Sequence, residues 1–123
     1  MIRIVGVQRS SELEQEFVLL QNQGSLRMNL RGHLILSDDS LERDDYHVRA
    51  HLFRDDVMIP PGNYVLLHTG NGEPKWMRTK DLQLVYYAYM GRIRPVWEQC
   101  TGPFHVLGPQ HTYSERRETL LLR

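Results

Sequence analysis

The sequence has little cysteine, no long hydrophobic run and no excess of charge of either sign. Cys100 is the single cysteine among 123 residues, so no internal disulfide can form and a four-cysteine zinc site is excluded. No run approaches the roughly 18 apolar residues of a membrane span. The first residues show neither a long apolar stretch nor a small-residue cleavage site. We therefore expect a soluble, cytoplasmic protein, or a domain excised from a larger secreted one.

Positive and negative charges are balanced. The chain carries 15 Lys and Arg and 15 Asp and Glu, which gives a formal net charge of zero. A neutral chain has no overall field that would draw it to nucleic acid or to an anionic membrane. We therefore expect no membrane binding and no general nucleic-acid binding, although a net charge of zero does not exclude local basic patches.

Apolar residues alternate or come in short runs rich in β-branched and aromatic side chains, which is typical of strands. We expect strands at about residues 2–8, 14–22, 33–38, 46–53, 64–69 and 82–90, and shorter ones at PVWEQ, PFHVLG and TLLLR. Residues 75–81 could form a short helical turn. Several short strands between turns predict an all-β sandwich, a single domain over residues 1–123. We expect about eight or nine mostly antiparallel strands and no helix longer than about two turns.

The alternation also predicts which side chains form the core. Tyr46, Val48, Ala50 and Leu52 share one face of their strand, because successive side chains of a strand point to opposite faces. Trp97 is large enough to fill the middle of a small two-sheet core. We expect the buried residues to be Val18, Leu20, Leu34, Leu36, Val48, Leu52, Val65, Leu67 and Trp97.

Four segments resemble the lamin tail domain family, an immunoglobulin-like β-sandwich found in nuclear lamins and in bacterial and archaeal proteins. They are EFVLLQNQG (16–24), MNLRGHLILSDD (28–39), FRDDVMIPPGNYVLLHTGNG (53–72) and VWEQCTGPFHVLG (96–108). They follow the family's order and are most similar to its prokaryotic members. Two departures are His33-Leu34, where the family usually has a tryptophan, and EQCTGP after Trp97. The resemblance implies an interaction role and transfers no catalytic residue.

Histidine and cysteine could carry chemistry. His47 and His51 have the spacing of a helical metal pair, but on a strand four residues span roughly 13 Å, too far to share one ion. Cys100 and His105 could form a nucleophile and its base, yet no third group is identifiable. We therefore expect no metal site, no cofactor and no catalytic residue.

Two loops have weaker signatures. Asp38, Asp39, Asp44 and Asp45 could hold calcium between loops, but they lack the alternating spacing of a dedicated calcium loop. TGNGEP contains Gly-x-Gly, but no helix follows that could complete a phosphate site. We interpret both as ordinary turns.

The stretch LVYYAYMGRIRPVW (84–97) combines tyrosines with arginines. Tyr87 and Tyr89 share one strand face, and Arg92 and Arg94 follow. Such a group could bind a protein, a glycan or single-stranded nucleic acid. The alternative is that one tyrosine set is in the core and the other is ordinary strand surface. We take Tyr87, Tyr89, Arg92 and Arg94 as the candidate binding residues.

Three functions compete. The first is a non-catalytic interaction or scaffold module that binds a protein partner or a second copy of itself. The second is a ligand-binding module for glycan or single-stranded nucleic acid, and the third is a metal-dependent hydrolase. The last segment, TLLLR, favours self-association, because an apolar terminal strand at a sheet edge can pair with another chain. Pairing of TLLLR with the first strand of the same chain is an equal alternative to pairing with a second chain.

Overall fold

The computed structural model describes residues 1–45 and 47–115, which form ten strands and little helix. The predicted all-β sandwich is confirmed. The strands are β1 (Ile2–Gln8), β2 (Phe17–Asn22), β3 (Met28–Asn29), β4 (Leu34–Ser37), β5 (Ala50–Leu52), β6 (Met58–Ile59), β7 (Tyr64–His68), β8 (Lys75–Arg78), β9 (Leu84–Tyr89) and β10 (Phe104–Leu107). The other elements are the 3-10 turn η1 (Leu13–Gln15) and the helix α1 (Asp39–Arg43).

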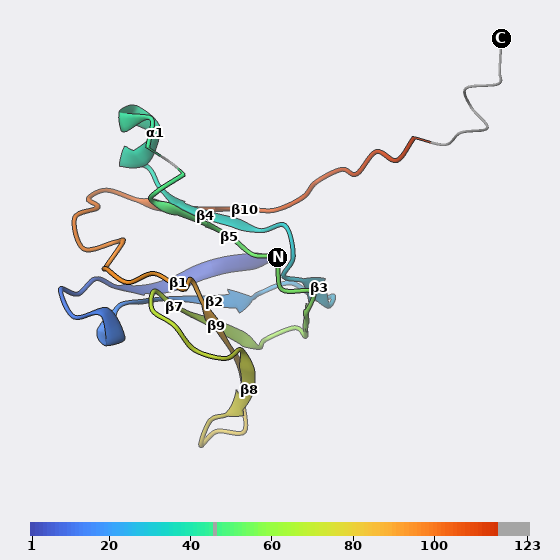
Figure 1. Ribbon diagram of the computed structural model, residues 1–123. Helices are drawn as coiled ribbons and strands as arrows, with labels where there is room; N and C mark the ends of the chain where they lie inside the picture. The colour runs from blue at the N-terminus through green and yellow to red at the C-terminus, as the bar shows by residue number, and fades with distance from the viewer. Residues whose placement is uncertain (46, 116–123) are drawn as a thin grey trace, which may run out of the picture.

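The strands form two layers (Figure 1). A five-stranded sheet has the order β1-β2-β7-β9-β8, a three-stranded sheet has the order β10-β4-β5, and β3 pairs with β6. All pairs are antiparallel except β7 with β9. Because β8 follows β7 in the chain but lies beyond β9 in the sheet, the connection 69–74 must cross β9. Within the described residues, no helix is long and apolar enough to cross a membrane.

The core lies between the two layers. The predicted core residues Val18, Leu20, Val65, Leu67 and Trp97 are all 0 % exposed. The ring of Trp97 meets that of Phe104 at a steep angle, with centroids 5.1 Å apart. Trp97 therefore fills the interior as its size predicts.

The strand expected at 46–53 is shorter, and part of its predicted core is wrong. Val48 is 48 % exposed and Leu52 is 49 % exposed. The strand begins at Ala50, because the residues before it form a turn. In that turn the carbonyl of Asp45 accepts hydrogen bonds from the amides of Val48, at 2.9 Å, and Arg49, at 3.2 Å. Backbone groups used in this turn cannot continue the sheet.

The inward face of this sheet is also the opposite of the expected one. Ile35 pairs with His51, and Ile35 and Phe53 are buried in the central cluster. Paired residues share a face, so Leu34, opposite Leu52, faces away from the core. Leu36 is buried as predicted but lies outside that cluster, and Leu34 is only half-buried. Side chains of these strands therefore alternate as expected, but the set that faces the core is the one expected to face solvent.

Three other segments differ from expectation. The strand expected at 14–22 begins only at Phe17, after η1. Residues 75–78 form the edge strand β8 rather than a helical turn, and all four are exposed. PVWEQ forms no strand; the amide of Cys100 bonds the carbonyl of Trp97 at 3.0 Å in a turn. Tyr46 and the segment TLLLR lie outside the described residues.

Candidate functional site

Arg92 links the two sheets where β9 ends. Gly91 has φ +73, a conformation that glycine adopts without strain, and it turns the chain after β9. The amide of Arg92 then bonds the carbonyl of Thr69 at 2.9 Å. The guanidinium donates to the carbonyls of Val48, at 3.0 Å, and Ala50, at 3.3 Å. Arg92 therefore holds the start of β5 to the end of β9.

A cavity of about 330 Å³ borders Arg92, and we call it the arginine groove. Arg49 and Arg94 line it together with Arg92, and Glu98 is the acidic residue of the lining. The other lining residues are Val48, Ile93, Pro95, Val96 and Gln99. Ile93 is 82 % exposed, so the groove presents apolar surface as well as positive charge to solvent.

Protein groups already position two of the three arginines. Nε of Arg49 forms an ion pair with Oδ2 of Asp45 at 3.1 Å, and its Nη1 lies 3.7 Å from Sγ of Cys100. Arg92 is fixed by the two carbonyl groups already described. Among residues 1–45 and 47–115, neither Arg92 nor Arg94 forms an ion pair with a carboxylate. The groove therefore concentrates positive charge in a chain that is neutral overall.

A second cavity of about 460 Å³ also borders Arg92, and we call it the histidine pocket. The ring of His51 meets that of Phe53 edge-on, with centroids 4.7 Å apart. Burial lowers the pKa of His51 to about 4; Asp55 opposes the change, and the positive charges of Arg92 and Arg54 add to it. The imidazole is therefore neutral at pH 7. The pocket lining comprises His47, Ala50, His51, Leu52, Arg54, Asp55, Tyr89, Met90 and Arg92.

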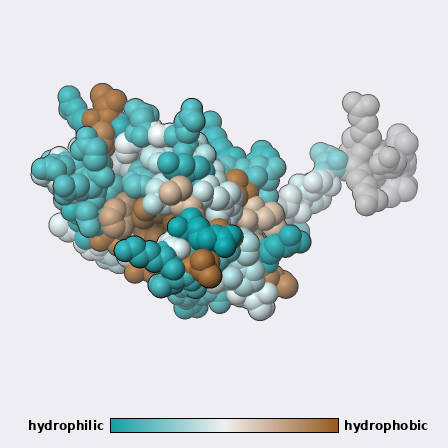
Figure 2. Space-filling model, turned by 90° about the horizontal axis from the view of Figure 1, so that it is seen from below, coloured by the Kyte–Doolittle hydropathy of each residue, from teal (hydrophilic) through white to brown (hydrophobic). Residues whose placement is uncertain are grey.

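The five-stranded sheet has a second face, turned away from the core, which we call the outer face. Its central cross-strand row runs from Leu19 through Leu66 to Tyr87 and ends at Lys75. The flanking rows add Phe17, His68 and Tyr89 on one side, and Gln21, Tyr64, Val85 and Met77 on the other. Figure 2, seen from the side of this face, shows hydrophobic patches between hydrophilic side chains.

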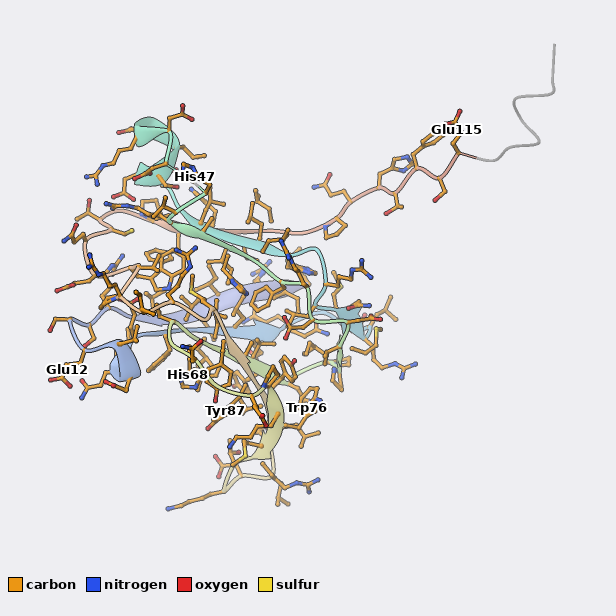
Figure 3. All side chains as sticks on the ribbon, in the orientation of Figure 1. Glu12, His47, His68, Trp76, Tyr87 and Glu115 are labelled. Atoms are coloured by element: carbon orange, nitrogen blue, oxygen red, sulfur yellow. The ribbon has the colours of Figure 1, made fainter. Side chains whose placement is uncertain are left out.

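One end of the outer face is covered. The ring of His68 stacks on that of Tyr89, with centroids 5.0 Å apart and planes 15° apart, and burial lowers the pKa of His68. The connection 69–74 brings Gly72 against the ring of Tyr89 so closely that a Cβ would overlap ring atoms. Figure 3 places His68 and Tyr87 on the outer side of this sheet and His47 far from them, near α1.

The four predicted binding residues are divided between these surfaces. Tyr87 lies on the outer face, where Nζ of Lys75 is 6.0 Å from its ring centroid. Arg92 and Arg94 line the arginine groove. Tyr89 lies in a flanking row of the outer face and also borders the histidine pocket together with Arg92. The structure thus brings Arg92 and Arg94 together in one groove and leaves Tyr87 and Tyr89 on the outer face, where the ring of His68 contacts both tyrosines.

The candidates for metal and thiol chemistry have other contacts. No group of three His, Cys, Asp or Glu side chains in the described part of the chain could hold a metal ion. Sγ of Cys100, which is buried, lies 3.4 Å from the carbonyl oxygen of Val96. Nε2 of His105 pairs with Asp38 at 2.7 Å. Asp39 accepts from Ser37, which lowers the pKa of its carboxyl, and from the amide of Thr101.

Sequence reasoning missed Glu16, which is fully buried. Its Oε1 accepts hydrogen bonds from Oγ1 of Thr69 at 2.7 Å and from the amides of Val96 at 2.8 Å and Trp97 at 3.1 Å. The signal was available, because Glu16 has the same parity as the inward residues Val18 and Leu20. A charged residue at an inward position is informative, since buried charges are usually paired or hydrogen-bonded.

Neither the family models, nor the curated proteins, nor the solved structures give a match to this chain. The resemblance to the lamin tail domain family therefore stays a prediction.

Proposed function

We propose that this protein is a non-catalytic interaction module that self-associates through its outer face. The observation that carries the proposal is the row formed by Leu19, Leu66 and Tyr87, in which each residue is only partly buried. Two sheets that pack face to face bury such rows against each other about 10 Å apart. A second copy supplies the same surface, as a two-fold symmetric interface requires.

The distribution of charge supports a protein surface as the occupant. The strand residues of the outer face carry charge only on the two edge strands, with Arg3 on β1 and Lys75 on β8. Its centre is made of leucine, valine and tyrosine side chains. Interface cores are depleted of charge and enriched in aromatic residues and methionine. A net charge of zero also lowers the repulsion between two copies.

A glycan or a single-stranded nucleic acid fits this surface less well. Stacking of sugars or bases needs open aromatic faces, whereas the ring of Tyr89 is stacked on His68 and also has Gly72 packed against it. Tyr87 and Arg92 also belong to different surfaces. The proposed role agrees with the interaction role that the lamin-tail resemblance implies.

The test is the mass of the protein in solution. Light scattering coupled to size exclusion should give about 29 kDa, which is twice the 14.5 kDa of one chain, in the micromolar range. Leu66→Glu places a charge at the centre of the outer face and should give the monomer mass. Leu107→Glu is the matched control, because Leu107 is 54 % exposed on the other sheet, and it should leave the dimer intact.

A wild-type monomer at all concentrations up to about 100 μM would refute self-association. Dimers of equal stability in the Leu66→Glu and wild-type proteins would place the interface elsewhere. Circular dichroism of both variants checks that each remains folded.

A further inference from the structure

We propose that the arginine groove is a separate binding site that takes an acidic segment of a protein partner, with carboxylates placed against Arg92 and Arg94. This site shares no residue with the row formed by Leu19, Leu66 and Tyr87. It therefore goes beyond the proposed function, and either proposal can fail without the other.

Preorganisation is the first argument. Arg92 is fixed by the carbonyls of Val48 and Ala50, and Arg49 by Asp45. A guanidinium has five donors, so each keeps N–H groups free to bind an incoming carboxylate. Side chains that are already ordered lose little conformational entropy when a ligand binds. The groove is thus arranged for an anion before the anion arrives.

Unbalanced charge is the second argument. Three arginines line the groove against the single acid Glu98. Asp45 offsets Arg49, but Arg92 and Arg94 have no ion-pair partner among the residues that the structure describes. Repulsion between these cations is relieved when an anion binds, and guanidinium and carboxylate groups form strong bidentate pairs.

The apolar part of the lining identifies the class of anion. Val48 and Ile93 are 48 % and 82 % exposed, and both lie next to the arginines. An acidic peptide with interspersed apolar residues can use both kinds of contact. A phosphate backbone has no apolar group to place against Val48 and Ile93. The observations therefore favour an acidic protein segment over nucleic acid.

The experiment measures binding of a labelled decapeptide of alternating glutamate and leucine by fluorescence anisotropy. We expect saturable binding that weakens with added salt. Arg94→Gln removes a cation that forms no ion pair within the described residues. We expect it to weaken binding about tenfold, which is the loss of affinity expected from one hydrogen bond between charged groups. Arg27→Gln, an exposed arginine in the loop before β3, makes the same charge change and should leave affinity within about twofold.

Two further probes decide the ligand class. The same peptide with glutamine in place of glutamate should not bind, whereas binding unchanged by this replacement would overturn the role of the carboxylates. A 12-nucleotide oligothymidine that binds more tightly than the acidic peptide, with loss in Arg94→Gln, would overturn the proposal in favour of nucleic acid. Absence of peptide binding to the wild type up to about 1 mM, or equal losses in Arg94→Gln and Arg27→Gln, would also overturn it.

Leu66→Glu should bind the peptide with unchanged affinity, which separates this site from the outer face.

Discussion

Oε1 of Glu16 accepts a hydrogen bond from the backbone amide of Trp97 at 3.1 Å, although 81 positions separate the two residues. The same oxygen accepts from Val96 and Thr69. One carboxylate oxygen therefore fixes the turn that carries the central tryptophan. Because Val96 also lines the arginine groove, this buried contact joins the core to a candidate binding surface.

Replacing Glu16 by alanine should strongly destabilise the protein. The substitution leaves three donors without their acceptor, two of them backbone amides, and each unsatisfied buried group costs about 1–3 kcal/mol. We expect the free energy of unfolding to fall by about 3 kcal/mol or more in urea denaturation. Glu14→Ala, at an exposed position two residues earlier, should change it by less than about 0.5 kcal/mol. A Glu16→Ala variant as stable as Glu14→Ala would contradict the role of this carboxylate.

Truncating Trp97 should have a comparable effect for a different reason. Trp97→Ala removes a fully buried aromatic ring and should lower the free energy of unfolding by about 3–5 kcal/mol. Trp76, on the edge strand β8, is 39 % exposed and serves as the control. Trp76→Ala should cost about 1 kcal/mol. A loss below about 1 kcal/mol for Trp97→Ala would mean that the ring does not support the core.

The fold was largely predictable because most strands alternate clearly and are bounded by turn residues. Val18, Leu20, Val65 and Leu67 follow that rule, and all are 0 % exposed. The rule failed at Val48, where local hydrogen bonds of the Asp45 turn replace strand pairing. A pattern of alternation shows which residues share a face, but it does not say which face meets the core.

The candidate site was predictable only in part. The local sequence brings Arg92 and Arg94 close together, so their shared groove follows from adjacency. Arg49 comes from a distant part of the sequence, before β5, and only tertiary folding places it in the same groove. The separation of Tyr87 from these arginines likewise depends on the turn at Gly91, which directs the chain off the sheet.

The protein should lose stability in mildly acidic solution through His51. Its pKa is about 4 in the folded state because of burial, and the ordinary value is 6.5. The unfolded chain therefore takes up a proton first, so this stabilisation is complete above pH 6.5 and is lost as the pH falls toward 4. His51→Gln removes this titration. Between pH 7.5 and 4.5, the stability advantage of wild type over the variant should shrink by about 2 kcal/mol. A constant difference would show that His51 titrates normally when folded.

Arg92→Ala should change both stability and the titration of His51. The variant loses hydrogen bonds to the carbonyls of Val48 and Ala50, which should lower the free energy of unfolding by about 1–2 kcal/mol. It also removes a positive charge that disfavours protonation of His51, so the pKa of that imidazole should rise, although burial keeps it below 6.5. NMR titration of the histidine ring protons measures this rise directly.

Arg94→Ala is the matched control, because Arg94 is exposed and is absent from the charges that act on His51, and it should alter neither quantity. An unchanged pKa in Arg92→Ala, together with unchanged stability, would show that Arg92 does not join β5 to β9 in solution, and the arginine groove would lose its fixed guanidinium.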